Sequence, residues 1–295
     1  MWLLIGGDSE IGAAAYQSLK TRGVTAAATT RRKTQVAADR PFLDLSAPLE
    51  NWEPPSGTSA ACIFAAVARV EACAADPRAS AHVNVAQTLA LADRLLGHGI
   101  PVLFLSTNQV FDGTVPDVVA GAPHSPVTEY GRQKARAEAG FFSRMELGMP
   151  AAVLRLAKVV SRDMPLLRDW SKKLAAGQPI RAFSDMTMAP VETAMVCGAI
   201  AMLMKAGASG VFQLTGSRDL PYLEIGRHIA SELGVDRSLV GEGTTVEAGL
   251  PAGSRRMHTT LDSSRLRDEY GVAPPDVLAV VNSVIASKRR KTEYQ

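Results

Sequence analysis

Short apolar runs alternate with amphipathic segments through the first half of the chain. The apolar runs are typical of buried strands, and the segments between them repeat their apolar residues with a helical period. Strands are predicted at residues 2–5, 24–29, 61–66, 101–106 and 152–156, and helices at 13–23, 80–98 and 128–147. This alternation predicts a parallel sheet with helices on both faces.

Beyond Arg155 the pattern becomes irregular, because prolines interrupt it repeatedly. A helix near residues 192–205 is expected to return to the main sheet. We therefore predict an α/β protein with a Rossmann-type, doubly wound parallel sheet. We expect residues 1–160 to form the domain built on this sheet and residues 161–295 to form most of a smaller C-terminal lobe.

Composition narrows the function classes. The 295 residues can bury a sizeable core, and a formal net charge of +3 is too small to indicate nucleic-acid binding. Cys62, Cys73 and Cys197 have no metal or disulfide spacing, which fits a reducing cytoplasm. No apolar run is long enough to span a membrane, and residues 2–5 are too short for a signal peptide. The basic run 288–291 is predicted to be a solvated tail.

A glycine-bearing turn follows the first predicted strand. It runs from Gly6 to Gly12, and a helix follows it, the context in which a dinucleotide pyrophosphate binds at a helix N-terminus. Gly6 would permit the tight turn, and Gly12 would permit close packing of helix on strand. Ser9 replaces the usual middle glycine, so a merely structural turn is the alternative. The residues predicted to line the cofactor here are Gly6, Ser9, Glu10, Ile11 and Gly12.

The second strand ends in basic residues. An NAD site usually has an acid here for the ribose hydroxyl, whereas arginine can bind the 2′-phosphate of NADP. Arg31 and Arg32 therefore predict NADPH rather than NADH, with a solvated basic loop as the alternative. Asp44, after the next short apolar run, is a candidate contact to the adenine, although a plain loop aspartate is also open.

Tyr130 and Lys134 are four residues apart, so on a helix they share one face. A lysine ammonium there can lower the pKa of the phenol, which could then exchange a proton with a substrate oxygen. An exposed amphipathic helix is the competing interpretation of this spacing alone.

Several motifs occur together in a characteristic order. The segment 105–113 contains Ser106-Thr107 and ends in Phe-Asp-Gly, and the segment 126–138 reads Pro-x-x-x-Tyr-Gly-x-x-Lys-x-x-x-Glu. Further landmarks are Ala65-Ala66, Val70-Glu71, Asp76-Pro77, Val83-Asn84, Ala189-Pro190-Val191 and Leu261-Asp262. In these motifs the chain resembles the extended short-chain dehydrogenase/reductase superfamily, and within it the dTDP-4-dehydrorhamnose reductase family.

The resemblance implies specific roles. Tyr130 would be the acid/base, Lys134 would hold the nicotinamide ribose and tune Tyr130, and Thr107 would hydrogen-bond the substrate oxygen. Ala65 and Ala66 would line the cofactor. Residues 1–160 would bind NAD(P), and the smaller lobe would bind the substrate. Ser106, Asn108 and Arg255 are further candidates for substrate contacts. Arg155, Arg168, Arg255 and Arg256 are candidate diphosphate contacts, because guanidinium groups match phosphate geometry.

The chain also departs from the family pattern. Asn108 and Gln109 stand where the reductases have Asp and Tyr, and the stretch 116–119 lacks the family's Pro-Tyr-x-Glu sequence. We therefore predict no metal site, and a homodimer stays an open expectation. The leading interpretation is an NADPH-dependent oxidoreductase acting on a nucleotide-linked keto-sugar. A sugar-nucleotide epimerase and a non-catalytic NAD(P)-binding regulatory protein are the alternatives.

Overall fold

The computed structural model describes residues 1–161, 164–251 and 255–286. The chain divides into two compact units. Unit 1 comprises residues 1–111, 123–155 and 194–212, and unit 2 comprises residues 112–122, 156–193 and 213–295. The basic run at 288–291 lies outside the described residues.

Unit 1 is built on a six-stranded sheet with the order β10-β5-β4-β3-β1-β2. The strands are β1 (Trp2–Ile5), β2 (Ala26–Ala28), β3 (Ala60–Ile63), β4 (Val102–Thr107), β5 (Ala151–Leu156) and β10 (Gly210–Leu214). β1 pairs in parallel with β2 and β3, and β3 pairs in parallel with β4. The order reverses beside β1, which confirms the predicted doubly wound α/β arrangement.

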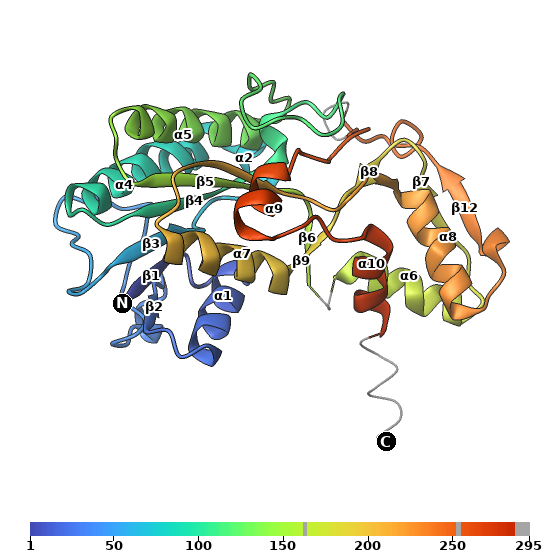
Figure 1. Cartoon of the computed structure of the whole chain (residues 1–295). Helices are drawn as coiled ribbons and strands as arrows, with labels where there is room; N and C mark the ends of the chain where they lie inside the picture. The colour runs from blue at the N-terminus through green and yellow to red at the C-terminus, as the bar shows by residue number, and fades with distance from the viewer. Residues whose placement is uncertain (162–163, 252–254, 287–295) are drawn as a thin grey trace. The chain divides into compact units, whose positions relative to one another are not determined.

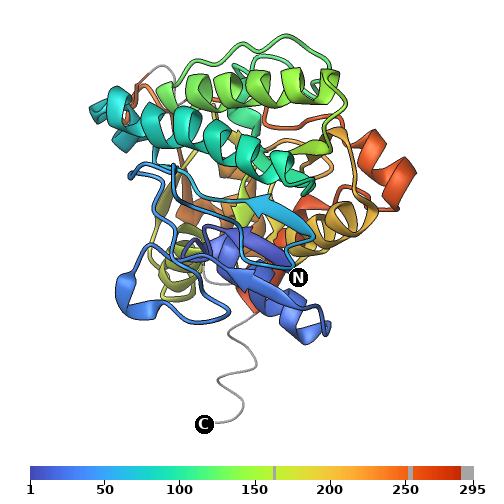
Figure 2. The same ribbon diagram turned by 90° about the vertical axis from the view of Figure 1, so that its left-hand side faces the viewer.

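Helices cover both faces of this sheet (Figures 1 and 2). On one face lie α4 and α5, and on the other lie α1 and α7. The helices are α1 (Glu10–Thr21), α2 (Val70–Ala75), α3 (Pro77–Ala81), α4 (Thr88–Gly97), α5 (Glu129–Glu146) and α7 (Thr193–Ala206), with short 3₁₀ turns at Lys33–Gln35 and Asn108–Val110. Leu91, Leu95 and Phe141 are fully buried against strand residues such as Leu3 and Phe104. Burial of this apolar surface is the main driving force for the layered arrangement.

The single helix predicted at residues 80–98 is not continuous in the structure. It is divided into α3, a π-helical turn at His82–Gln87, and α4. A π turn inserts one extra residue, which changes the direction of the side chains before and after it. Here Asn84 lies in the turn and is 2% exposed.

Within its described residues, unit 2 contains three small two-stranded sheets. β7 (Ile180–Phe183) pairs with β12 (Val240–Gly243), β8 (Thr187–Met188) with β11 (Leu220–Pro221), and β6 (Val159–Val160) with β9 (Val191–Glu192). Its helices are α6 (Pro165–Ala175), α8 (Tyr222–Leu233), α9 (Ser264–Tyr270) and α10 (Val277–Ala286), with a 3₁₀ turn at Arg237–Leu239. α6, α8 and α10 enclose the core of this unit, to which Trp170, Ile225, Ile229 and Val281 belong.

Candidate functional site

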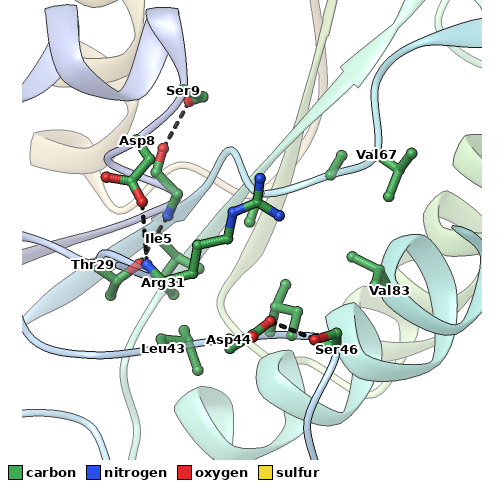
Figure 3. Close-up of a pocket in the computed structure, with 14 residues that line it drawn as sticks. Ile5, Asp8, Ser9, Thr29, Arg31, Leu43, Asp44, Ser46, Val67 and Val83 are labelled. Atoms are coloured by element: carbon green, nitrogen blue, oxygen red, sulfur yellow. Dashed lines mark hydrogen bonds between the residues drawn. The ribbon is translucent and has the colours of Figure 1, made fainter. Parts of the chain in front are cut away.

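A pocket of about 270 Å³ lies at the carboxyl ends of β1, β2 and β3, where ligands bind in sheets of this kind. Figure 3 shows it in close-up. Its lining residues all belong to unit 1: Ile5, Gly6, Asp8, Ser9, Thr29, Arg31, Leu43, Asp44, Leu45, Ser46, Ala65, Ala66, Val67 and Val83. Six of the predicted cofactor residues are among them, namely Gly6, Ser9, Arg31, Asp44, Ala65 and Ala66.

Gly6 has the backbone conformation that the tight turn requires. Its φ is +97°, and a Cβ there would lie 2.7 Å from the amide nitrogen of Ala65. Only glycine lets the turn after β1 approach the chain after β3 this closely. The two walls of the pocket are therefore brought together by backbone rather than by side chains.

Ser9 caps the helix that begins at the turn. Its hydroxyl donates to the carbonyl oxygen of Gly6 at 2.7 Å and accepts from the amide of Gly12 at 3.1 Å. It thus satisfies an unpaired amide at the N-terminus of α1. Glu10, Ile11 and Gly12 form the first turn of α1 and do not line the pocket. The N-terminus of α1 nevertheless lies beside the pocket, because its capping residue Ser9 lines the pocket.

Arg31 extends into the pocket from the end of β2 (Figure 3). Asp44 also lines the pocket and accepts from the amide and hydroxyl of Ser46 at 2.9 and 2.8 Å. These hydrogen bonds, with a smaller contribution from the charge of Arg31, lower the pKa of Asp44. Arg32 is exposed and does not line the pocket.

Tyr130 lies in the first turn of α5, and Thr107 ends β4. The Thr107 hydroxyl accepts from the amide of Gln109 at 3.2 Å. Thr128 caps α5 by accepting from the amide of Gly131 at 3.1 Å. Gly131 lies directly against the carbonyl oxygen of Gln109, where a Cβ would have no room. The start of α5 is therefore seated on the loop that follows Thr107.

Lys134 points from α5 onto β4. Its Nζ donates to the carbonyl oxygen of Leu105 at 2.7 Å and lies 4.3 Å from the centre of the Phe104 ring. Burial lowers the pKa of Lys134 to about 8. The ammonium is thus held at the end of β4, one helical turn from Tyr130.

The expectation that Lys134 lowers the pKa of Tyr130 is wrong for this structure. Burial is the main cause that raises the pKa of the phenol well above its usual value, and the nearby thiol of Cys73 adds to the effect. Low-dielectric surroundings disfavour the charged tyrosinate. Tyr130 is therefore protonated throughout the neutral range, the form that a proton donor needs.

A buried polar network connects the pocket wall to α5, and sequence reasoning missed it. Asn84 accepts from the amide of Val67 at 2.7 Å and donates to the carbonyl of Val67 at 3.0 Å and to Gln133 Oε1 at 2.7 Å. Gln133, fully buried, donates to the hydroxyl of Ser80 at 2.8 Å and to Glu129 Oε1 at 3.0 Å. Since Val67 lines the pocket and Gln133 precedes Lys134, the network fixes two parts of the site against each other. The position of Asn84 among the landmarks was the one available signal.

Arg155, weighed as a diphosphate contact, is instead fully buried in an ion pair. Its Nη2 lies 2.7 Å from Glu138 Oε2, and His124 Nε2 lies 2.8 Å from the same oxygen. Burial alone would raise the pKa of Glu138, but hydrogen bonds from His124 and Arg155 and the charge of Arg155 outweigh it, so the pKa is lowered. Arg155 therefore serves the interior of unit 1.

The remaining substrate candidates lie in two places. Ser106, next to Thr107 in β4, is buried, and Asn108 Oδ1 accepts from the Thr107 hydroxyl at 3.4 Å. Arg255 belongs to unit 2, where its Nε lies 3.8 Å from Asp185 and half of the side chain is exposed. Arg256 in the same segment is buried. Arg255 is not among the residues that line the pocket.

For residues 1–161, 164–251 and 255–286, the structure addresses two features, a metal site and a membrane-spanning helix. No group of three or more His, Cys, Asp or Glu side chains is arranged to hold a metal ion there. In the same part of the chain, no helix is both long enough and apolar enough to cross a membrane.

Comparison with known proteins gives similarities along most of the chain. It is 28% identical over 218 residues to a probable low-salt glycan biosynthesis reductase of Haloferax volcanii, covering 72% of this chain and 71% of that protein. It is 25% identical over 225 residues to a dTDP-4-dehydrorhamnose reductase of Sinorhizobium fredii, covering 72% and 75%. The structure of a dTDP-4-dehydrorhamnose reductase of Bacillus anthracis in complex with NADP matches with a TM-score of 0.80 at 15% identity, covering 97% of this chain and 99% of that one.

The structural match shows the fold, and this is the fold that the resemblance in the sequence implied. The model of the family described as the RmlD substrate binding domain matches residues 1–290, nearly the whole chain. This chain belongs to the RmlD substrate-binding-domain family.

Proposed function

We propose that the protein is an NADPH-dependent reductase of a keto-sugar carried on a nucleotide. The observation that carries this proposal is the packing of α5 on the end of β4. It brings Tyr130, Lys134 and Thr107 to one edge of the sheet that forms the dinucleotide pocket. The family and the reductases among its relatives favour the same chemistry.

The pocket suits a dinucleotide on physical grounds. Gly6 and Ser9 line the pocket beside the N-terminus of α1, a position at which a pyrophosphate can bind. Arg31 offers a planar set of donors to a 2′-phosphate, and Asp44 offers acceptors to an adenine or ribose. When bound, NADPH supplies a hydride to the carbonyl carbon.

The side chains divide the rest of the reaction between them. The phenol of Tyr130 donates its proton to the substrate oxygen as the alcohol forms. The hydroxyl of Thr107 donates to the same oxygen and stabilises its developing negative charge. Lys134 holds the nicotinamide ribose with donors that Leu105 does not occupy. Ser106, Asn108 and Arg255 are proposed to contact the substrate.

The test is to incubate the purified protein with NADPH and a panel of dTDP- and UDP-linked keto-sugars, and to monitor turnover as the loss of NADPH absorbance. We expect stoichiometric oxidation of NADPH with at least one member. An epimerase would instead interconvert sugar nucleotides without added cofactor. A regulatory protein would bind the dinucleotide and turn over nothing.

Arg31→Ala is expected to weaken NADPH binding roughly ten- to a hundredfold and to leave NADH binding nearly unchanged. A hydrogen bond to a charged group contributes about 1.5–3 kcal/mol, which corresponds to that ratio. Arg31 is exposed, so solvent screening favours the lower end. Calorimetric titration of both dinucleotides measures this, with Arg32→Ala as the matched control. Equal losses in the two variants would mean that the basic loop acts only as a diffuse charge.

Lys134 should make cofactor affinity depend on pH. Because its pKa in the free protein is lowered to about 8 by burial, the ammonium is lost as the pH rises above that value. If binding requires the charged form, the Kd for NADPH should rise about tenfold between pH 7 and pH 9. Lys134→Met should bind weakly at both pH values and show no such rise. A wild-type Kd that stays constant across this range would contradict the role of Lys134 at the ribose.

A further inference from the structure

Asp8 lies at the end of β2 although it belongs to the turn after β1. Its carboxylate accepts from the hydroxyl of Thr30 at 3.0 and 2.9 Å and from the amide of Arg31 at 3.2 Å. Figure 3 shows this carboxylate beside the backbone of Arg31, whose side chain runs on into the pocket. Asp8 itself lines the pocket. The fold therefore places a carboxylate at a strand end whose own sequence has basic residues and no acidic one.

Asp8 has one oppositely charged partner among the described residues, Arg40. Arg40 Nη2 lies 2.7 Å from Asp8 Oδ1, and this ion pair is partly exposed, at 34% for Arg40 and 16% for Asp8. Arg31 meets Asp8 through its backbone amide rather than through its guanidinium. Arg40 is thus engaged by Asp8, which leaves Arg31 as the pocket-lining arginine that can meet a phosphate.

We infer that Asp8 is a second determinant of dinucleotide choice and acts against Arg31. A carboxylate at this strand end can accept from a free ribose 2′-hydroxyl and repels a 2′-phosphate dianion. The preference for NADPH over NADH is therefore smaller than Arg31 alone would produce. This inference rests on the proposed dinucleotide site.

Asp8→Asn tests the inference with little change of shape. The amide oxygen can still accept from Thr30 and Arg31, but the charge is removed. We expect the ratio of the NADH Kd to the NADPH Kd to rise roughly five- to fiftyfold, mainly through tighter NADPH binding, because a like charge beside the phosphate is removed. The gain should shrink in high salt. An unchanged ratio, or a shift towards NADH, would overturn the inference.

Asp8→Asn also frees Arg40 from its ion pair, and a freed Arg40 could itself attract the phosphate. The substitution Asp8→Asn is therefore repeated in an Arg40→Gln background. If the carboxylate itself opposes the phosphate, Asp8→Asn raises the ratio in this background too. A gain that disappears there would show that Arg40 and not Asp8 is the determinant, and the inference would fail. Asp8→Ser, which keeps a hydroxyl, serves as the second variant if the asparagine variant does not fold. Asp44→Asn is the control for another carboxylate of the same pocket, and should change both Kd values by a similar factor.

These titrations require no turnover. If the wild type binds both dinucleotides but reduces no keto-sugar nucleotide, the proposed reaction fails while the inference about Asp8 is still tested. If turnover is found and the ratio does not respond to Asp8→Asn, the inference fails while the proposed reaction stands.

Discussion

Tyr130→Phe is expected to lower turnover by roughly 10²–10⁴ while cofactor binding stays intact, which is the usual scale for losing a positioned acid. The phenol is protonated at neutral pH, and burial raises its pKa further above that range. The phenylalanine ring fills nearly the same space at the start of α5, so the loss should appear in kcat and not in the Kd for NADPH. Steady-state kinetics and cofactor titration measure the two quantities separately.

Tyr222→Phe is the matched control. Tyr222 is also largely surrounded by protein and has a raised pKa from burial, but it lies in α8 with its ring edge against Trp170. Its loss of a hydroxyl should leave kcat close to that of the wild type. If Tyr130→Phe kept activity within a few-fold of the wild type, another group would have to donate the proton.

Arg155→Met is expected to reduce the free energy of unfolding at pH 7 by about 3–5 kcal/mol, because it leaves the buried carboxylate of Glu138 without its main partner. Both side chains are 0% exposed. The double variant Arg155→Met/Glu138→Leu should recover most of the loss, since an apolar pair needs no compensation. Urea denaturation followed by far-UV circular dichroism measures all three proteins.

Arg265→Met is the corresponding control on the surface of α9. Arg265 Nε lies 2.7 Å from Glu269 Oε1, and the two side chains are 41% and 45% exposed. Such exposed pairs contribute about 0–1 kcal/mol. A similar small loss for Arg155→Met would mean that Glu138 is neutralised by His124 or by a bound proton.

Lowering the pH should reduce the difference in the free energy of unfolding between the wild type and Arg155→Met. The pKa of Glu138 is lowered in the folded protein, so its contribution to wild-type stability is complete above the unfolded value of about 4.3. It is lost as the pH falls through the lower folded value. In the variant, burial without Arg155 should raise that pKa, so Glu138 takes up a proton earlier and the penalty of its charge disappears.

The sequence predicted those features that depend on local order. The Tyr130–Lys134 spacing follows from one helix, and β1 was predicted at its observed bounds. Asp8 was missed because its partners Thr30 and Arg40 are 22 and 32 residues away. Gln133 was missed for the same reason, since Asn84 is 49 residues away. Contacts between distant segments depend on how the sheet and helices pack, and no local pattern of apolar and polar residues encodes them.

Gly131 packs directly against the carbonyl oxygen of Gln109, and this contact sets the distance between the start of α5 and the loop after β4. Any side chain at position 131 would lift the start of α5 off the loop that begins at Asn108. Such a change would move Tyr130 away from Thr107 without altering either residue. Chemical rescue with small alcohols or phenols could not restore the reaction, because the missing element would be a distance and not a functional group. A redesigned substrate site would therefore have to keep a glycine directly after Tyr130.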